Sequence, residues 1–180
     1  MKPLDAEDVT LAQLLAAQDM HTQMIWDTPM LGLGDYNYTR GFAGTEFVRG
    51  QQGDRWITDP TLELRMPAQP HKIRSVPPLQ TYLSNHAHRR HEREYCCART
   101  ISAATEWLEC NYKHDGFFLW VDMWDPHEPF DCPWYDYGLY ADPSYEGDQM
   151  LYPQYGRPNY MTEADRTNVR ARYAGSTTLV

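Results

Sequence analysis

The sequence predicts an α/β protein, built as a partial layered sheet with flanking helices. The first observation is the run Phe117–Met123, which is too uniformly apolar for a half-exposed strand and therefore indicates a central parallel strand. The second is the helical spacing of apolar residues in the middle of the chain and near both ends. The third is the order of these elements, because helix, strand, helix, strand and helix in alternation are typical of a layered sheet.

The first helix is expected to start near Asp5 and Asp8, because acidic residues are favourable in a first helical turn. Its helical spacing is carried by Leu11, Leu14, Leu15 and Gln18. The helix should stop near Asp19, and a short strand should follow over His21–Trp26. A further strand is expected over Thr45–Val48, between loops rich in Gly, Tyr and Arg.

The middle of the chain predicts an extended connection followed by one long helix. Residues 60–78 carry five prolines and indicate an extended surface connection. A single helix is expected over Arg89–Cys110 and should be broken at His114–Gly116. The expected apolar face of this helix comprises Tyr95, Ile101, Ala104, Trp107 and Leu108.

The C-terminal part predicts a long loop and a last helix. Residues 126–159 are rich in aromatic and acidic side chains, with Pro and Gly between them, and should form an aromatic and acidic loop. Thr162 and Asp165 have the spacing of a capping box at a helix start. The expected face of that helix comprises Val169, Tyr173, Ser176 and Val180. Because no C-cap signal follows, we expect residues 1–180 to be a single incomplete domain.

Composition excludes several classes of function. A hydrophobic content of 42% suffices for a core, and a formal charge of −9 argues against nucleic acid or an anionic membrane as a partner. No apolar run is long enough to span a bilayer and no signal-peptide core is present, so a cytoplasmic location is favoured. Basic residues gather over 71–99 and acidic residues over 115–165, so the two regions could attract each other.

His127 is the candidate catalytic residue that the local pattern indicates. It follows the apolar strand directly and lies between Pro126 and Pro129, which restrict the backbone around it. A strand that ends in a rigid turn with a titratable side chain is a common wall of an active site. The alternative is a solvated acidic loop with an incidental histidine.

Two other groups of residues, one of histidines and one of acidic residues, are candidate metal ligands. The histidines His86, His88 and His91 do not share a face on a helix or a strand, and neighbouring arginines would repel a cation. The acidic set is Asp122, Asp125, Glu128 and Asp131. Solvation is the favoured fate of both groups. The four cysteines lack a zinc-ligand spacing and indicate reduced thiols, and the sequence contains no Gly-rich phosphate loop and no G-x-S-x-G nucleophile turn.

Several segments, in order, resemble the central part of a sulfatase, in the alkaline-phosphatase-like superfamily. The residues that carry this resemblance are 8–15, His21-Thr22, Arg40-Gly41-Phe42, 49–56, Phe117–Pro129 with its Pro-His-x-Pro turn, Tyr145-Glu146-Gly147, 160–163 and 170–175. The resemblance implies an incomplete sulfatase core that hydrolyses sulfate esters of small molecules or saccharides. It assigns to His127 the binding of the ester or the protonation of its leaving oxygen.

The resemblance also implies calcium and a formylglycine nucleophile for a full-length family member. This chain has no Cys-x-Pro-x-Arg motif and lacks the paired aspartates that hold calcium. Where many sulfatases have a lysine and a histidine, it reads Trp26–Met30, and Asp19 replaces a helix-ending glycine. We therefore expect a fragment of a sulfatase-like hydrolase that is inactive as an isolated chain.

Three further expectations remain open at this point. A phosphonate or phosphodiester hydrolase of the same superfamily would share these segments. A non-catalytic binding module would instead keep the aromatic and acidic loop over residues 126–159 for a sulfated sugar. An apolar strand with missing neighbours also predicts partial folding, or association through exposed strand edges.

Overall fold

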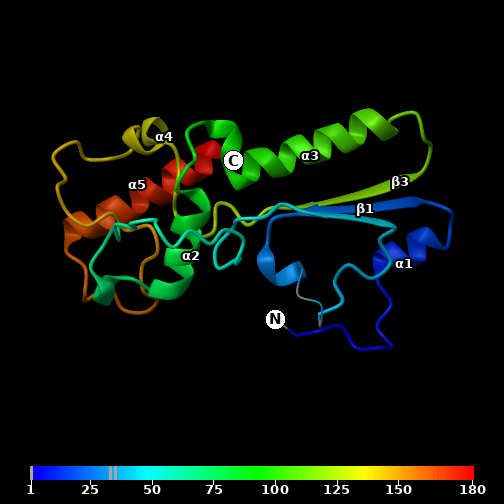
Figure 1. Ribbon diagram of the computed structural model, residues 1–180, viewed down its shortest axis with the longest axis horizontal. Helices are drawn as coiled ribbons and strands as arrows, with labels where there is room; N and C mark the ends of the chain where they lie inside the picture. Colours follow the sequence, from blue (N-terminus) through cyan, green and yellow to red (C-terminus); the bar gives the residue numbers. More distant parts are fainter. Residues whose placement is uncertain (1, 33, 35) are drawn as a thin grey trace. The chain divides into compact units, whose positions relative to one another are not determined.

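The computed structural model describes residues 2–32, 34 and 36–180 (Figure 1). Contacts divide the chain into two compact units, each made of two segments. The first unit comprises Met1–Gln51 and Arg93–Trp124, and the second comprises Gln52–Glu92 and Asp125–Val180. The single incomplete catalytic domain expected over residues 1–180 stays a prediction. The division into two units rests on contacts between residues, and such contacts do not test a catalytic role.

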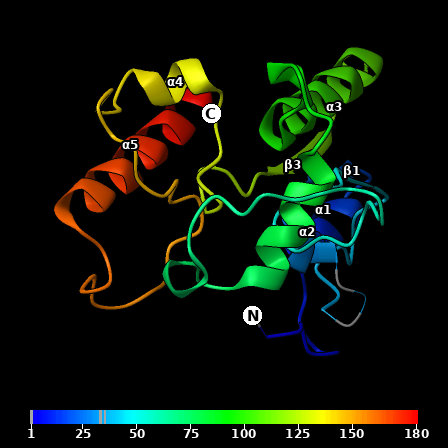
Figure 2. The same cartoon turned by 60° about the vertical axis from the view of Figure 1, so that its left-hand side comes forward.

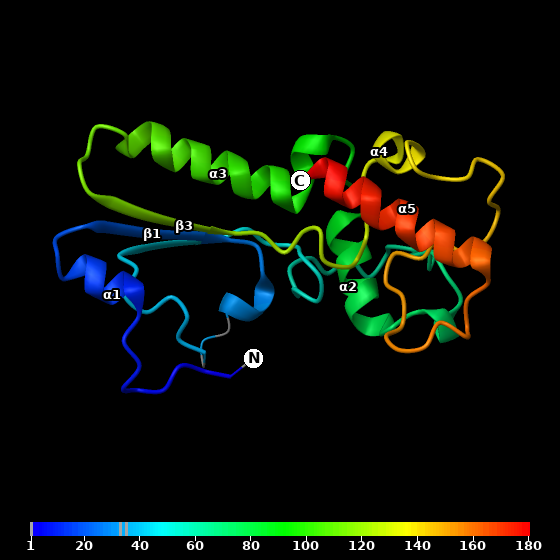
Figure 3. The same cartoon turned by 180° about the vertical axis from the view of Figure 1, so that it is seen from behind.

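The first unit is a three-stranded parallel sheet between two helices, which confirms the α/β class. Strand β1 (His21–Trp26) lies between β2 (Gly44–Phe47) and β3 (Phe117–Asp122). In this register Met24 lies opposite Thr45 on one side and Trp120 on the other. Helix α3 (Cys96–Asn111) covers one face of the sheet and α1 (Leu11–Ala16) lies on the other (Figures 1 and 3).

The core of the first unit lies between α3 and the sheet. Ile25, Val48 and Ala104 are its buried members, and Trp107 and Leu119 pack against them. β1 is the central strand, and Ile25 is fully buried. Burial of an Ile side chain contributes about 1.5–3 kcal/mol, so α3 is held to the sheet by the hydrophobic effect.

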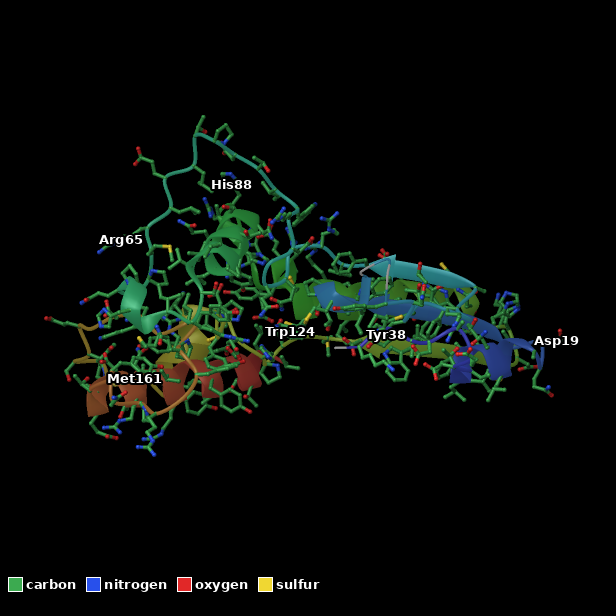
Figure 4. All side chains as sticks on the ribbon, turned by 90° about the horizontal axis from the view of Figure 1, so that it is seen from below. Asp19, Tyr38, Arg65, His88, Trp124 and Met161 are labelled. Atoms are coloured by element: carbon green, nitrogen blue, oxygen red, sulfur yellow. The ribbon has the colours of Figure 1, made fainter. Side chains whose placement is uncertain are left out.

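Helix α1 begins at Leu11, which is later than the start near Asp5 and Asp8 that the sequence predicts. Thr10 caps it, because its hydroxyl accepts a hydrogen bond from the Gln13 N–H at 3.2 Å while Gln13 accepts one from the Thr10 N–H at 3.0 Å. Asp8 instead accepts a hydrogen bond from the Asp5 N–H in a turn before the helix. The chain then turns back at Asp19, whose φ of 59° is the left-handed conformation that aspartate tolerates (Figure 4).

Strand β3 is parallel, as predicted, but the prediction of a central strand is wrong. Among the described residues β3 pairs only with β1, so it is an edge of this sheet. Trp120 is 46% exposed and Val121 is 37% exposed. An apolar run predicts burial on both faces, but it does not determine how many strands lie beside it.

The exposed edge of β3 leads to an expected result for the isolated chain. An apolar strand edge is a template for pairing with another chain, so the chain should self-associate. Val121→Lys should shift sedimentation velocity profiles towards monomer, whereas Val9→Lys, at a more exposed position of the same unit outside the sheet, should not. A wild-type monomer with uniformly slow amide exchange along β3 would contradict this expectation.

The long helix predicted over Arg89–Cys110 is wrong at its start. The chain forms α2 (Val76–His86), which the sequence analysis missed, and α3 begins only at Cys96. Pro77 and Pro78 lie in the first turn of α2, where a missing N–H costs nothing. The extended connection predicted over 60–78 therefore ends at Ser75, and a short 3₁₀ turn over Pro70–Lys72 interrupts it.

The buried face of α3 also differs from the predicted one. Ile101 is 49% exposed and Leu108 is 38% exposed, although both belonged to the expected apolar face. The buried positions are Cys96, Cys97, Thr100 and Ala104. Small side chains let the helix approach the sheet closely. On this face of α3, close packing is achieved with small residues and not with large apolar ones.

The second unit contains α2, α4 (Trp134–Gly138) and α5 (Glu163–Leu179), with irregular segments between them (Figure 2). The capping box of Thr162 and Asp165 is confirmed at the start of α5. The loop predicted over 126–159 is wrong at α4, which packs against α5. Buried hydrophobic residues of the core are Ala68, Ile73, Leu79, Tyr82, Met150 and Tyr152.

The face predicted for α5 is correct in part. Ser176 is buried, but Tyr173 is 50% exposed and Val180 is 52% exposed. The residues that α5 buries are Asp165, Asn168, Ala171, Gly175 and Ser176. This face is rich in small and polar residues, which hydrophobic periodicity does not detect.

Gly175 allows the close approach of α4 to α5. A Cβ at this position would lie 2.6 Å from Cys132 Sγ and 3.0 Å from the backbone of Tyr137. Gly175→Ala is therefore expected to lower the free energy of unfolding of the second unit by about 1–3 kcal/mol. Gly138→Ala in α4 meets nothing within 4 Å and should stabilise slightly. Chemical denaturation of both variants checks this, and equal stability would contradict it.

Candidate active site around His127

His127 lies in a rigid turn of the second unit. It is flanked by Pro126 and Pro129, and the Asp125–Pro126 and Glu128–Pro129 peptide bonds are both cis. The side chain of His127 is 36% exposed, so it is reachable from solvent. The structure therefore places the histidine in a proline-bounded turn, as the sequence predicts.

The ring of His127 is held by the next residue in the chain. Its Nδ1 lies 2.9 Å from the backbone carbonyl oxygen of Glu128 and 3.1 Å from carboxylate Oε2 of Glu128. The Glu128 side chain itself is only 9% exposed. A buried carboxylate beside a histidine is a common way to orient an imidazole for proton transfer.

Two residues distant in sequence hold Glu128 in turn. Arg74 Nη1 donates to Glu128 Oε1 at 2.5 Å, and the Tyr155 hydroxyl donates to the same oxygen. Arg74 also lies over the Tyr155 ring, 3.8 Å from its centroid. The hydrogen bond to Glu128, followed by burial, raises the pKa of the Tyr155 hydroxyl. His127, Glu128, Arg74 and Tyr155 are called the histidine cluster below.

Sequence reasoning found His127 but missed Arg74 and Tyr155. Arg74 is 54 positions from Glu128 and Tyr155 is 27 positions from it, so no short motif contains the cluster. The available signal was the attraction expected between the basic stretch 71–99 and the acidic stretch 115–165. Arg74 with Glu128 and Arg89 with Asp131 confirm that attraction within the second unit.

The two candidate groups of metal ligands are not assembled in the part of the chain that the structure describes. Within residues 2–32, 34 and 36–180, no three His, Cys, Asp or Glu side chains come together. Glu128 and Asp131 instead pair with arginines, and Asp122 accepts a hydrogen bond from Thr28. His86 is the last residue of α2, and its ring contacts that of Tyr82.

A second titratable site lies in the first unit, at the carboxyl ends of its strands. Asp27 directly follows β1 and is fully buried. Its carboxylate accepts hydrogen bonds from the Trp124 N–H at 2.6 Å and the Thr100 hydroxyl at 3.0 Å. Burial, with a smaller contribution from Asp122, raises the pKa of Asp27 to about 6, although these hydrogen bonds oppose the rise. The carboxyl ends of parallel strands commonly carry functional sites.

A polar cavity of about 750 Å³ lies elsewhere in the second unit. It is lined by residues of the connection before α2 and by Glu146, Gly147, Asp148 and Gln149. Arg65 contributes to its wall and is labelled in Figure 4. His127 is not part of this wall, so the cavity belongs to a different surface from the histidine cluster.

Comparisons with known proteins support the fold. Neither protein-family models nor the sequences of curated proteins give a match. Among solved structures, the chain is similar to the phosphonate monoester hydrolase of Agrobacterium radiobacter, with a TM-score of 0.56 and 18% sequence identity. The similarity covers 98% of this chain and 42% of that chain.

The TM-score of 0.56 over 98% of this chain supports a shared architecture. The chain has an α/β fold that is similar to part of this solved chain. Within the described residues, no helix combines the length and apolar character that crossing a bilayer requires.

Proposed function

We propose that the chain is part of a hydrolase of sulfate or related esters and that His127 acts on the leaving-group side of its site. The observation that carries this proposal is the histidine cluster, in which a buried carboxylate holds His127 in a Pro-His-x-Pro turn. An imidazolium near neutral pH can protonate the oxygen that leaves a cleaved ester. The similarity to 42% of a solved hydrolase chain supports a larger whole.

The sulfatase resemblance implies calcium and a formylglycine for a full-length family member. No Cys-x-Pro-x-Arg motif is present in the chain, and no group of three acidic or histidine ligands forms among the described residues. The role proposed for His127 requires neither of them, because it concerns only the proton at the leaving oxygen.

A phosphonate or phosphodiester is the second candidate substrate. The solved structure similar to this chain is a phosphonate monoester hydrolase, which favours this class. In a phosphonate monoester the leaving group is also an alcohol or phenol oxygen. His127 would therefore perform the same proton transfer for either ester.

The test uses substrates with different leaving groups. The chain would be expressed together with the polypeptide encoded on both sides of it and assayed with 4-nitrophenyl and phenyl esters of sulfate and of a phosphonate. Loss of a general acid costs roughly 10²–10⁴-fold and affects the poorer phenol leaving group most. His127→Ala should therefore slow phenyl esters far more than 4-nitrophenyl esters, whereas His88→Ala should change neither.

Two results would contradict the proposal. Equal activity of His127→Ala and wild type on phenyl esters would remove the role of His127. Calcium-dependent turnover of an aryl sulfate by the isolated chain would contradict its being part of a larger hydrolase. The preferred ester, sulfate or phosphonate, is read from the same assay.

A binding module is favoured by one separate observation. Within the aromatic loop over residues 126–159, Trp134 at the start of α4 is 80% exposed and Leu139, directly after α4, is 68% exposed. Exposed aromatic side chains are suited to stacking on sugar rings. Binding of a sulfated sugar that Trp134→Ala abolishes, without turnover in the hydrolase assay, would favour the module.

A further inference from the structure

We infer that Glu128 is a positioning residue that fixes the hydrogen of His127 on Nδ1, and that Arg74 and Tyr155 set the side of Glu128 that faces the ring. The tautomer of a neutral histidine is determined by the partners of its ring nitrogens. Four contacts within the second unit support this inference, two at Nδ1 of His127 and two at Oε1 of Glu128. Only its last step, the role of Nε2 in a reaction, rests on the proposed function.

The first step concerns the partners of Nδ1. The two oxygens near it are a backbone carbonyl at 2.9 Å and a carboxylate oxygen at 3.1 Å, both from Glu128. A carbonyl oxygen and an ionised carboxylate accept hydrogen bonds and have no hydrogen to donate. Nδ1 must therefore carry the hydrogen, and in the neutral ring the lone pair is on Nε2.

The second step concerns the orientation of Glu128. Arg74 and Tyr155 both donate to Oε1, so this oxygen is directed away from the histidine. Oε2 is the oxygen that remains directed at Nδ1. Because the carboxylate is only 9% exposed, water competes little for these bonds.

The third step concerns the reaction. With Nδ1 held by Glu128, proton exchange with a leaving oxygen takes place at Nε2. Glu128 thus acts through His127.

Nuclear magnetic resonance of the isolated chain tests the tautomer directly. Long-range ¹H–¹⁵N spectra of chain labelled at histidine, recorded above the imidazole titration, distinguish Nδ1–H from Nε2–H. The expected result for wild-type His127 is the Nδ1–H form. A wild-type Nε2–H form overturns the inference without any variant.

The variant that tests the cause is Glu128→Gln. Arg74 and Tyr155 should retain the amide oxygen on their side, so the NH₂ group would face Nδ1 and reverse the hydrogen bond. The population of the Nδ1–H form should then fall in favour of Nε2–H, with only the Glu128 backbone carbonyl at 2.9 Å left to accept from Nδ1. Glu146→Gln removes the same charge from an exposed position and should leave the spectrum unchanged. A wild-type tautomer in Glu128→Gln would overturn the role of the carboxylate.

Tyr155→Phe provides a milder second variant if the glutamine variant does not fold. It keeps the carboxylate and Arg74, so the Nδ1–H form should persist, and its loss would contradict the assignment. These spectra require no turnover. The tautomer inference and the hydrolase proposal can therefore fail separately, the first by nuclear magnetic resonance and the second by the leaving-group assay.

Discussion

Lys72→Met is expected to lower the free energy of unfolding of the second unit by about 3–5 kcal/mol. Lys72 Nζ lies 2.9 Å from Asp148 and 3.0 Å from Asp165, and only 14% of its side chain is exposed. The Asp165 side chain is 4% exposed, so removal of the cation would leave two neighbouring carboxylates without their shared partner. Amide hydrogen exchange along α5 measures this loss within the second unit.

The matched control for Lys72→Met is Arg170→Met. Arg170 lies in α5 and is 3.6 Å from Glu163, but both side chains are about 70% exposed. Exposed pairs of this kind contribute about 0–1 kcal/mol, so this variant should resemble wild type. Similar losses in both variants would show that the Lys72 cluster behaves as a surface ion pair.

The group formed by Lys72, Asp148 and Asp165 also makes the stability of the second unit depend on pH. Burial alone would raise the pKa of Asp165, but hydrogen bonds from Tyr145, Thr162 and Lys72 outweigh it and lower that pKa. The stability that Asp165 contributes is therefore present above the unfolded-state pKa of about 3.9 and lost as pH falls below it. Lys72→Met should weaken this acid dependence.

The first unit is expected to lose stability over a different pH window. The pKa of Asp27 rises from 3.8 to about 6, chiefly because of burial. Between these values the folded chain holds a proton that the unfolded chain has released, so stability falls as pH rises through this window. A rise of that size corresponds to about 3 kcal/mol, and above about pH 6 the loss is complete.

Asp27→Asn tests the origin of this dependence. An amide has the shape of the protonated carboxyl and no charge, so the variant should lose the dependence between about pH 4 and pH 6 and be more stable than wild type above it. Asp19→Asn, at an exposed left-handed position, should keep the wild-type profile. Hydrogen exchange along β1 at several pH values checks both, and a flat wild-type profile would contradict the account.

The Thr100 hydroxyl opposes the rise in the pKa of Asp27. It lies 2.9 Å from the Cys96 carbonyl oxygen and 3.0 Å from Asp27 Oδ2, but it has only one hydrogen. When that hydrogen goes to Asp27 it stabilises the ionised carboxylate, so burial raises the pKa against this hydrogen bond.

Local chemistry in the sequence was sufficient for particular elements. His21–Trp26 is a strand over the predicted residues, and Thr162 with Asp165 starts the last helix as predicted. The turn at Asp19 adopts the expected left-handed conformation. Each of these depends on side chains within a few residues of the position, so a short pattern is enough to predict it.

Other elements were mispredicted because the deciding contacts are distant. The exposed Ile101 and the buried Thr100 lie next to each other in α3, and burial of Thr100 depends on Asp27, which is 73 positions away. Helix α2 was missed because its prolines fall in the first turn, where they are harmless. The edge position of β3 follows from strand order, which apolar character does not encode.

The sequence by itself determined the α/β class and the proline-bounded turn that contains His127. It did so because backbone conformation and hydrophobic periodicity are local properties. Only the tertiary structure showed that Arg74 and Tyr155 hold Glu128 and that burial raises the pKa of Asp27 to about 6. Hydrogen bonds and desolvation depend on which distant side chains meet, and that depends on packing of the whole unit rather than on any short segment.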